Sequence, residues 1–291
     1  MNVEPPPTAE VLVTAERPGP RLWQVTSGEH TVWILGTQSP LPQKLRWRSA
    51  EVEAAIAGAD EVLGAYTVSL RMGSQEWQRT STTLEEDLPR KVYVRWTKMR
   101  DRYIDPRIPT DELLPASAAY LLQMSAFEHN GMTSSDEVWR TIYGLARLHD
   151  VPIRPQSYEV ESPVTKVSKR TAREAGVRCL VQTMDRLDVD MTESRRRAEA
   201  WADGDMKMLR QLARSDQSYS ETLARSWPFL SDKDVDRLIG QETTRLAAVI
   251  ERAMIRNRRT FAALPVHMLM KEDGVLSILR AAGHRVEEPV D

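Results

Sequence analysis

The chain has 291 residues, of which 41% are apolar and 28% charged, a composition typical of a globular protein with a sizeable core. Its formal net charge of −2 predicts no overall attraction to nucleic acid or to anionic lipid. No apolar run approaches the roughly 20 residues that span a bilayer, so we expect no membrane-spanning segment. The single cysteine, Cys179, excludes an intramolecular disulfide, and its helix-like spacing favours a buried structural thiol.

The N-terminal segment, residues 1–19, is rich in proline and predicts a disordered leader. It has neither the basic n-region nor the apolar h-region of a signal peptide. An alternative is that it begins a mature chain from which a signal peptide has been removed. Residues 20–291 are expected to form one domain, because no linker rich in proline, glycine and serine divides them.

The first structured elements are expected to be strands. Two β-rich runs, residues 21–26 and 31–35, flank Ser-Gly-Glu-His and predict a hairpin. The second run stops at Gly36 and continues into a polar turn, residues 37–39, which prolines close. A strand that ends in glycine and polar residues is a common way of presenting side chains to a ligand.

A strand, a helix and a second strand follow one another between residues 31 and 68, which is the order of a βαβ unit. Ser49 is expected to cap the short helix, and residues 61–68 form the second strand. The periodicity is then helical from residue 84 to residue 258, apart from a short strand at residues 151–153.

Helices are expected at residues 89–103, 110–127, 138–149 and 232–258, with two or three more between 163 and 215. Pro115 is expected to kink the second helix, and Ser134 to cap the third in a capping box with Glu137.

The chain closes with a strand at residues 260–267, a helix at 273–282 that Gly283 ends, and a last strand at 284–289. The whole pattern predicts an α/β fold, with a mixed central sheet, flanking helices and a largely helical insertion at residues 84–258.

Most catalytic signatures are missing from the sequence. It contains no GxGxxG, P-loop, GxSxG, CxxC or HExxH motif, and its five histidines have no helical metal-ligand spacing among them. The residues alone therefore indicate an α/β protein without a recognisable reaction.

Three segments in a fixed order carry a family resemblance. The first segment contains LWQV, TVWILGT, a leucine-proline pair and WRSAEVEAAIAGADEVL. The middle segment is AEAWADGDMKML, and the last is MIRNRRTFAALPVHMLMKEDGVLSILRAAGHRVE. Together they resemble the TraB/GumN family over about residues 20–289. The chain is similar in particular to a divergent branch whose first motif reads GTxSPLP.

The resemblance implies a metal site at the edge of a sheet. Members of the Tiki type are membrane-anchored, metal-dependent proteases, whose chemistry is attributed to two Gly-x-x-His motifs and to acidic residues. Imidazole and carboxylate groups suit a divalent metal that activates water.

Most of these ligands are replaced in this chain. The first Gly-x-x-His falls on residues 36–39, where the histidine is Ser39, and the acidic residue that ends the next strand falls on Ala65. A second acidic position falls near residues 155–156, which are proline and glutamine. The second Gly-x-x-His falls on residues 264–267, where the glycine is lost and the histidine, His267, remains.

The Arg-Asn element of the family is intact at Arg256 and Asn257. The pair could bind an anionic group in the cleft or brace the end of a helix against the sheet. We expect the candidate residues to converge at the C-terminal edge of the sheet: Gly36, Thr37, Gln38, Ser39, Ala65, Arg256, Asn257 and His267.

The sequence thus favours a non-catalytic binding or accessory protein with a degenerate metal site, because catalytic zinc sites use about three protein ligands. No cofactor is expected. One alternative is a metal-dependent hydrolase or peptidase with rearranged ligands, which would use manganese, cobalt or zinc. Another enzymatic alternative is a serine nucleophile, Ser39, with His267 as its base.

A third alternative is an interaction protein that acts through its helical region. The partner is unknown: no nucleic acid is expected at a net charge of −2, and a protein or peptide ligand is left open. The resemblance also implies a periplasmic or secreted location in a bacterium.

Overall fold

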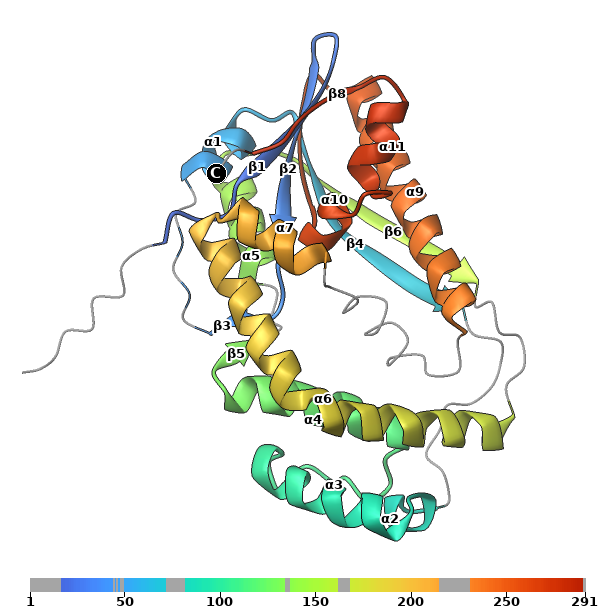
Figure 1. Ribbon diagram of the computed structural model, residues 1–291. Helices are drawn as coiled ribbons and strands as arrows, with labels where there is room; N and C mark the ends of the chain where they lie inside the picture. The colour runs from blue at the N-terminus through green and yellow to red at the C-terminus, as the bar shows by residue number, and fades with distance from the viewer. Residues whose placement is uncertain are drawn as a thin grey trace, which may run out of the picture.

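The computed structural model describes residues 17–43, 45, 47, 50–71, 82–133, 137–161, 168–214 and 231–289. Its centre is a six-stranded sheet in the order β6-β4-β7-β2-β1-β8 (Figure 1). The strands are β1 (Leu22–Ser27), β2 (His30–Thr37), β4 (Glu61–Arg71), β6 (Ile153–Glu161), β7 (Arg259–Pro265) and β8 (Arg285–Glu287). A separate two-stranded sheet joins β3 (Leu41–Pro42) and β5 (Met132–Thr133).

The sheet is mixed, as the sequence predicts. β1 pairs antiparallel with β2 and with β8, and Gly28 adopts a φ of 59° in the hairpin turn. β7 lies between β2 and β4 and is parallel to both, and β4 is parallel to β6. The expected hairpin, the strand that starts at Glu61 and the closing strand therefore share one sheet.

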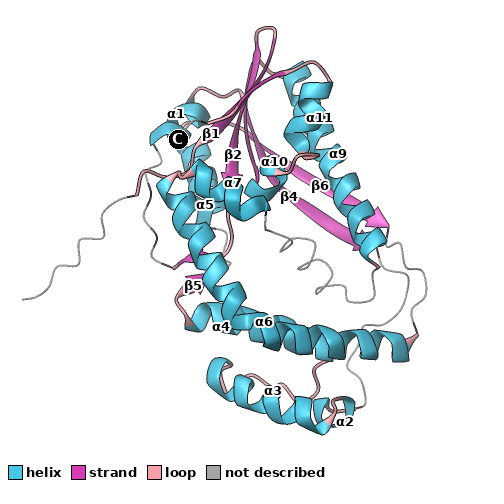
Figure 2. Cartoon of the chain, in the orientation of Figure 1, coloured by secondary structure: helices cyan, strands magenta, loops and turns pink. Residues whose placement is uncertain are grey.

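Helices cover the sheet on both faces (Figure 2). On one side α1 (Ala50–Ala57) packs against α5 (Glu137–Leu148), and on the other α9 (Asp232–Arg256) packs against α11 (Val275–Ala281). The short α10 (Val266–Met270) follows β7 directly and contacts β2 and α7 (Met206–Arg214).

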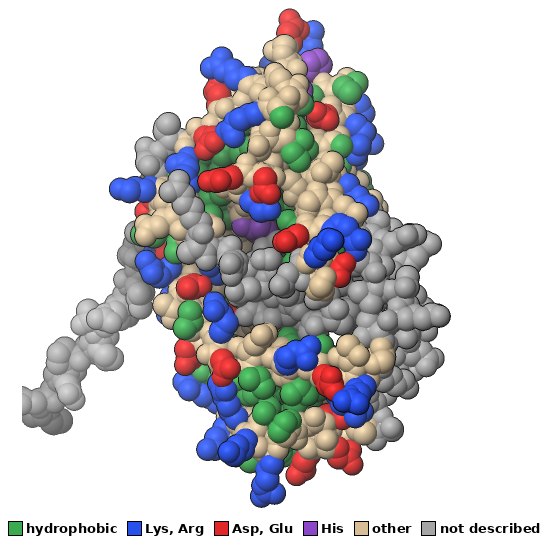
Figure 3. Space-filling view, turned by 45° about the vertical axis from the view of Figure 1, so that its right-hand side comes forward, with side chains coloured by type: hydrophobic (Ala, Val, Ile, Leu, Met, Phe, Trp, Pro, Cys, Tyr) green, Lys and Arg blue, Asp and Glu red, His purple; other side chains and the backbone are tan. Residues whose placement is uncertain are grey.

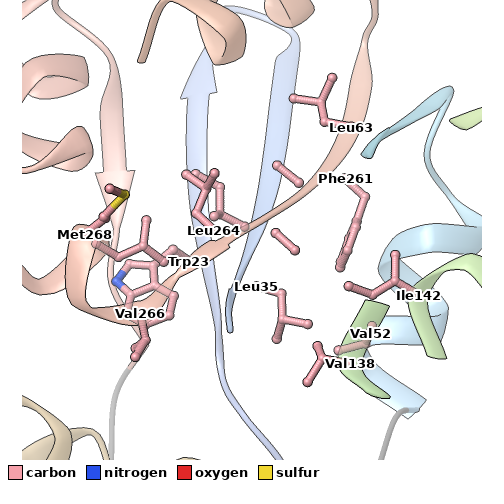
Figure 4. Packing of buried hydrophobic residues seen from close by; sticks show 14 of the residues in the cluster. Trp23, Leu35, Val52, Leu63, Val138, Ile142, Phe261, Leu264, Val266 and Met268 are labelled. Carbon is pink, nitrogen blue, oxygen red and sulfur yellow. The ribbon is translucent and has the colours of Figure 1, made fainter. Parts of the chain in front are cut away.

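Two groups of apolar side chains form the core around the sheet (Figure 4). Leu35 and Phe261 meet Val52 of α1 and Ile142 of α5 on one face. Trp23, Leu264, Val266 and Met268 pack together on the other.

A second hydrophobic cluster lies apart from the sheet, in a lobe of helices at the bottom of Figure 1. The lobe consists of α2 (Leu84–Asp87), α3 (Arg90–Tyr103), α4 (Pro115–His129) and the first part of α6 (Lys169–Asp203). Trp96, Leu122 and Leu180 are among its buried residues, and so is Cys179, in agreement with the predicted structural thiol. The 35 residues of α6 connect this helical lobe to α7 beside the sheet.

Within the described residues, α6 and α7 confirm the two or three helices expected between residues 163 and 215. Three other expectations differ from the structure. Pro115 does not kink a helix; it begins α4 at a first-turn position, where the missing N–H costs nothing. The strand expected at 151–153 extends from Ile153 to Glu161, and the closing strand stops at Pro265.

Some expectations lie outside the described residues: the caps at Ser49 and Ser134 and the leader up to residue 16. In the part of the chain that the structure covers, no helix combines the length and the apolar character that a membrane crossing requires.

Candidate functional site

The loop after β2 and the start of α10 lie side by side. β2 and β7 run parallel in a register that pairs Gly36 with Leu264 and Thr37 with Pro265. Both strands end at the same edge of the sheet, and His267 follows β7 by two residues. The structure therefore brings residues 36–39 and His267 to one edge, where α/β proteins commonly bind ligands.

Gly36 is required by packing at this edge. A Cβ atom added to it would lie 2.8 Å from the Trp23 ring and 3.0 Å from a methyl group of Val266. Its carbonyl oxygen accepts a hydrogen bond of 2.6 Å from the indole N–H of the fully buried Trp201. The glycine of the first motif thus has a structural reason to remain, even though no ligand follows it.

The polar residues of the loop interact mainly with the loop itself. The Gln38 side-chain amide donates to the carbonyl of Ser39 at 3.0 Å, and the Ser39–Pro40 peptide bond is cis. Ser39 is exposed, His267 is half-buried, and among the described residues the hydrogen bond shown at Ser39 is the one its carbonyl accepts from Gln38. A nucleophilic serine needs a base within hydrogen-bond reach, and this arrangement does not supply one.

Ala65 lies on β4, where the pairing with β6 is irregular between Leu63 and Tyr66. Its backbone N–H donates to the Tyr143 hydroxyl at 2.9 Å, and its methyl side chain has no ligand atom. Gln156, the other position expected to be acidic, donates from its side chain to the carbonyl of Arg154 at 3.1 Å. Neither position provides a carboxylate.

Arg256 and Asn257 do not join the other candidates, so the expected convergence is wrong for this pair. They precede β7, whereas His267 follows it, and a seven-residue strand separates the two ends by about 20 Å. At their edge they contact Glu61, the first residue of β4, with Arg256 Nη2 at 2.8 Å and Asn257 Nδ2 at 3.2 Å from the same carboxylate oxygen.

The contacts of Asn257 support the bracing role that was left open for this pair. Its side chain also donates to the Thr260 hydroxyl at 3.2 Å, and its carbonyl oxygen lies 2.7 Å from Nδ1 of His30. Asn257 ends α9, and its backbone N–H donates to the carbonyl of Ala253. The residue therefore fixes the end of α9 to the starts of β7 and β2.

Glu61 is the residue that sequence reasoning missed. Its side chain is only 7% exposed, and Arg154 binds its second oxygen at 2.5 Å. Burial alone would raise the pKa of this carboxyl, but hydrogen bonds and charges from Arg256 and Arg154 outweigh it and hold the pKa below its ordinary value. An acidic residue directly before a buried apolar run was the available signal, since such a side chain needs a partner.

The middle segment of the family resemblance, AEAWADGDMKML, contains a Trp-x-x-Gly-Asp element, and each of its three named residues has a structural role. The Trp201 indole N–H donates to the Gly36 carbonyl, and Gly204 ends α6 with a φ of 66°. The Asp205 side chain accepts a hydrogen bond of 2.8 Å from the backbone N–H of Met208 in the first turn of α7. The backbone N–H of Gly19 donates to the carbonyl of Ala202. The element connects α6, α7 and the segment before β1 to the loop after β2.

Changing Gly204 to alanine is expected to lower the free energy of unfolding by about 1–2 kcal/mol, the usual cost of a left-handed conformation for an L-residue. Its Cβ would also lie 2.8 Å from the Gly19 carbonyl oxygen. Urea unfolding measures the change. Gly240→Ala is the matched control, because Gly240 lies within α9 with nothing near its Cβ, and it should stabilise the protein. Equal effects of both changes would contradict the structural account of Gly204.

The candidate positions do not fit a divalent metal. At the edge that holds residues 36–39, the family positions supply one imidazole, His267, together with Ser39 and Ala65. Across the described ranges, no group of three or more histidine, cysteine, aspartate or glutamate side chains is arranged to hold a metal ion. Catalytic zinc sites use about three protein ligands, so no reaction step can be derived through a metal at these positions.

The architecture defines an α/β protein with a helical insertion, in which a short loop after β2 and a histidine after β7 share one edge of a mixed sheet. The family model described as TraB/PrgY/gumN family matches residues 21–288, and the chain belongs to this family. No curated protein and no solved structure matches the chain.

Proposed function

We propose that this member of the TraB/PrgY/gumN family is a non-catalytic binding or accessory protein that retains the family scaffold around a degenerate metal site. One observation carries the proposal: at the edge of the sheet shared by residues 36–39 and α10, the family's ligand positions offer a single imidazole, His267, and no carboxylate. Carboxylate and imidazole ligands together are what a hydrolytic divalent metal requires.

The arrangement of the polar groups gives further support. Glu61, a buried carboxylate of the sheet, lies at the opposite edge and is already engaged by Arg154, Arg256 and Asn257. It is therefore not available to complete a metal site with His267. The family resemblance also leads us to propose a periplasmic or secreted location in a bacterium, which fractionation of cells that express the tagged protein would test.

Calorimetric titration of metal-stripped protein with zinc, manganese and cobalt tests the proposal. The unmodified chain is expected to show no stoichiometric sub-micromolar binding, because zinc affinities of about 10–16 kcal/mol need a complete ligand set. The double change Ser39→His and Ala65→Glu should raise the affinity, and adding His267→Ala should abolish the gain.

A matched control keeps the number of added ligands the same. Thr192→His with Ala282→Glu adds one histidine and one glutamate at exposed positions on α6 and after α11, and it should not raise the affinity. A peptidase assay with added manganese or cobalt runs in parallel. Tight binding by the unmodified protein that disappears in His267→Ala, together with peptide cleavage, would show a metal-dependent hydrolase with rearranged ligands instead.

A further inference from the structure

The outward face of α3 is predominantly cationic. At 3.6 residues per turn, its exposed side chains fall within an arc of about 140°. They are Arg90, Lys91, Val94, Arg95, Lys98, Asp101 and Arg102, here called the α3 cationic face. Five cations and one carboxylate give this face a net charge of +4. The opposite side of the helix buries Trp96 and Tyr103 in the helical lobe.

Helix stability does not explain the position of these cations. Arg90 and Lys91 occupy the first turn of α3, which has no acidic residue, and Pro89 before them makes no side-chain capping hydrogen bond. The N-terminus of a helix carries a partial positive charge, so cations there oppose helix formation. The neighbouring α2 has the usual arrangement, with acidic residues in its first turn.

Much of the charge on the face is not neutralised by the protein. Arg90, Lys91 and Lys98 form no ion pair with any residue in the described ranges. Arg95 pairs with Asp185 of α6 at the border of the face, and the Arg102 guanidinium lies 4.9 Å from the centre of the Tyr103 ring. The one carboxylate of the face is itself neutralised, because Arg100 contacts Asp101 at 2.8 Å. 

Apolar groups are exposed beside these cations. Val94, within the face, is 46% exposed, and Ile108, just beyond the end of α3, is 41% exposed. An open depression of about 540 Å³ lies at that end of α3, and both acidic and basic side chains line it, among them Asp101, Arg102, Asp105 and Arg107. In Figure 3, Lys and Arg side chains gather at the lower left of the helical lobe and Asp and Glu side chains at its lower right, with apolar side chains between them.

We propose that the α3 cationic face binds the surface of a bilayer that contains anionic phospholipids. Lysine and arginine side chains near such a surface are attracted to its phosphate groups, and small exposed apolar side chains enter the boundary between headgroups and acyl chains. The chain as a whole has a net charge of −2, so its overall charge does not attract it to an anionic membrane. The proposed binding therefore depends on local contacts made by the α3 cationic face.

A planar surface fits the distribution of charge better than an extended polyanion does. Glu85 and Glu86 are exposed on α2, next to α3 in the helical lobe, and Asp105, which pairs with Arg107, follows α3. A nucleic acid that continued past the face would meet these carboxylates. A membrane plane that touches only the outward side of α3 avoids them.

Co-sedimentation of the full chain with lipid vesicles tests the proposal. The unmodified protein should bind vesicles of phosphatidylcholine with about one third phosphatidylglycerol in low salt, should bind pure phosphatidylcholine vesicles much less, and should dissociate as salt is raised. Lys91→Glu with Lys98→Glu should weaken binding at least tenfold, and Val94→Asp should weaken it further.

The control changes the same total charge elsewhere. Arg196→Glu with Arg252→Glu alters exposed cations of α6 and α9 and should leave vesicle binding unchanged. Circular dichroism of each variant establishes that α3 is still folded, and Lys91→Gln with Lys98→Gln gives a milder change if charge reversal unfolds it. The proposal fails if the unmodified protein ignores anionic vesicles or if the control loses as much binding. It also fails if a single-stranded oligonucleotide binds this face more tightly than the vesicles do.

Discussion

Replacement of Trp201 by alanine is expected to lower the free energy of unfolding by about 3–5 kcal/mol, the range for removing a large buried aromatic side chain. Trp201 is 1% exposed, packs edge to face against Trp47 with ring centroids 5.4 Å apart, and donates its N–H to the Gly36 carbonyl. The change would leave a cavity and an unsatisfied buried carbonyl at the loop after β2. Urea unfolding followed by circular dichroism measures the loss.

Trp201→Phe separates the two contributions. Phenylalanine keeps most of the apolar volume but has no N–H, so the loss should fall to about 1–3 kcal/mol, the cost of leaving a buried acceptor without a donor. Alanine at Trp33, which is only half-buried, should cost less than alanine at Trp201. If the free energy of unfolding of Trp201→Ala lies within about 1 kcal/mol of the value for the unmodified protein, the tryptophan does not anchor this loop.

Glu61→Gln is expected to cost about 2 kcal/mol at neutral pH. Breaking a buried ion pair typically costs 3–5 kcal/mol, but Arg154 and Arg256 are 53% and 36% exposed in their side chains, so water compensates them in part. The measurement is urea unfolding of both proteins. Glu174→Gln, which removes the carboxylate of an exposed pair with Arg170, should change stability far less.

The cost of Glu61→Gln should also depend on pH. The folded protein holds the pKa of Glu61 below the ordinary value of 4.5, so the unfolded chain takes up a proton at higher pH than the folded one. The carboxylate therefore stabilises the fold fully above the unfolded pKa, and this contribution disappears as the pH falls through the folded pKa. The stability difference between the two proteins should shrink steadily below about pH 4.5. A difference that stays constant into acid would contradict the assigned pairing.

Much of the sheet could be predicted because its signals are local. The hairpin depends on alternating apolar residues around Gly28, and the strand that begins at Glu61 depends on a short apolar run after a helix. Helix α3 was likewise expected within one residue of its observed start at Arg90. In these elements the pattern of side chains alone determines the face that is buried.

The parts that could not be predicted depend on contacts between distant residues. The contact of Trp201 with Gly36 spans 165 positions, and nothing near either residue indicates it. The family resemblance implied one site for Arg256, Asn257 and His267, but a resemblance in sequence does not place residues in space, and β7 separates the pair from His267 at opposite edges of the sheet. Pro265 ends β7 and lets α10 begin, which the apolar run around it concealed.

The position of β7 between β2 and β4 has a consequence for how the chain acquires its fold during synthesis. Without β7, the other five strands divide into one group with β4 and β6 and another with β1, β2 and β8. The strand that joins them spans Arg259–Pro265 and is made late, after almost nine tenths of the chain. A growing polypeptide must therefore hold two incomplete sheets, with exposed strand edges, until this segment leaves the ribosome. A nonsense mutation anywhere before β7 would leave the protein without the centre of its sheet, and we expect such a truncated product to aggregate or to be degraded.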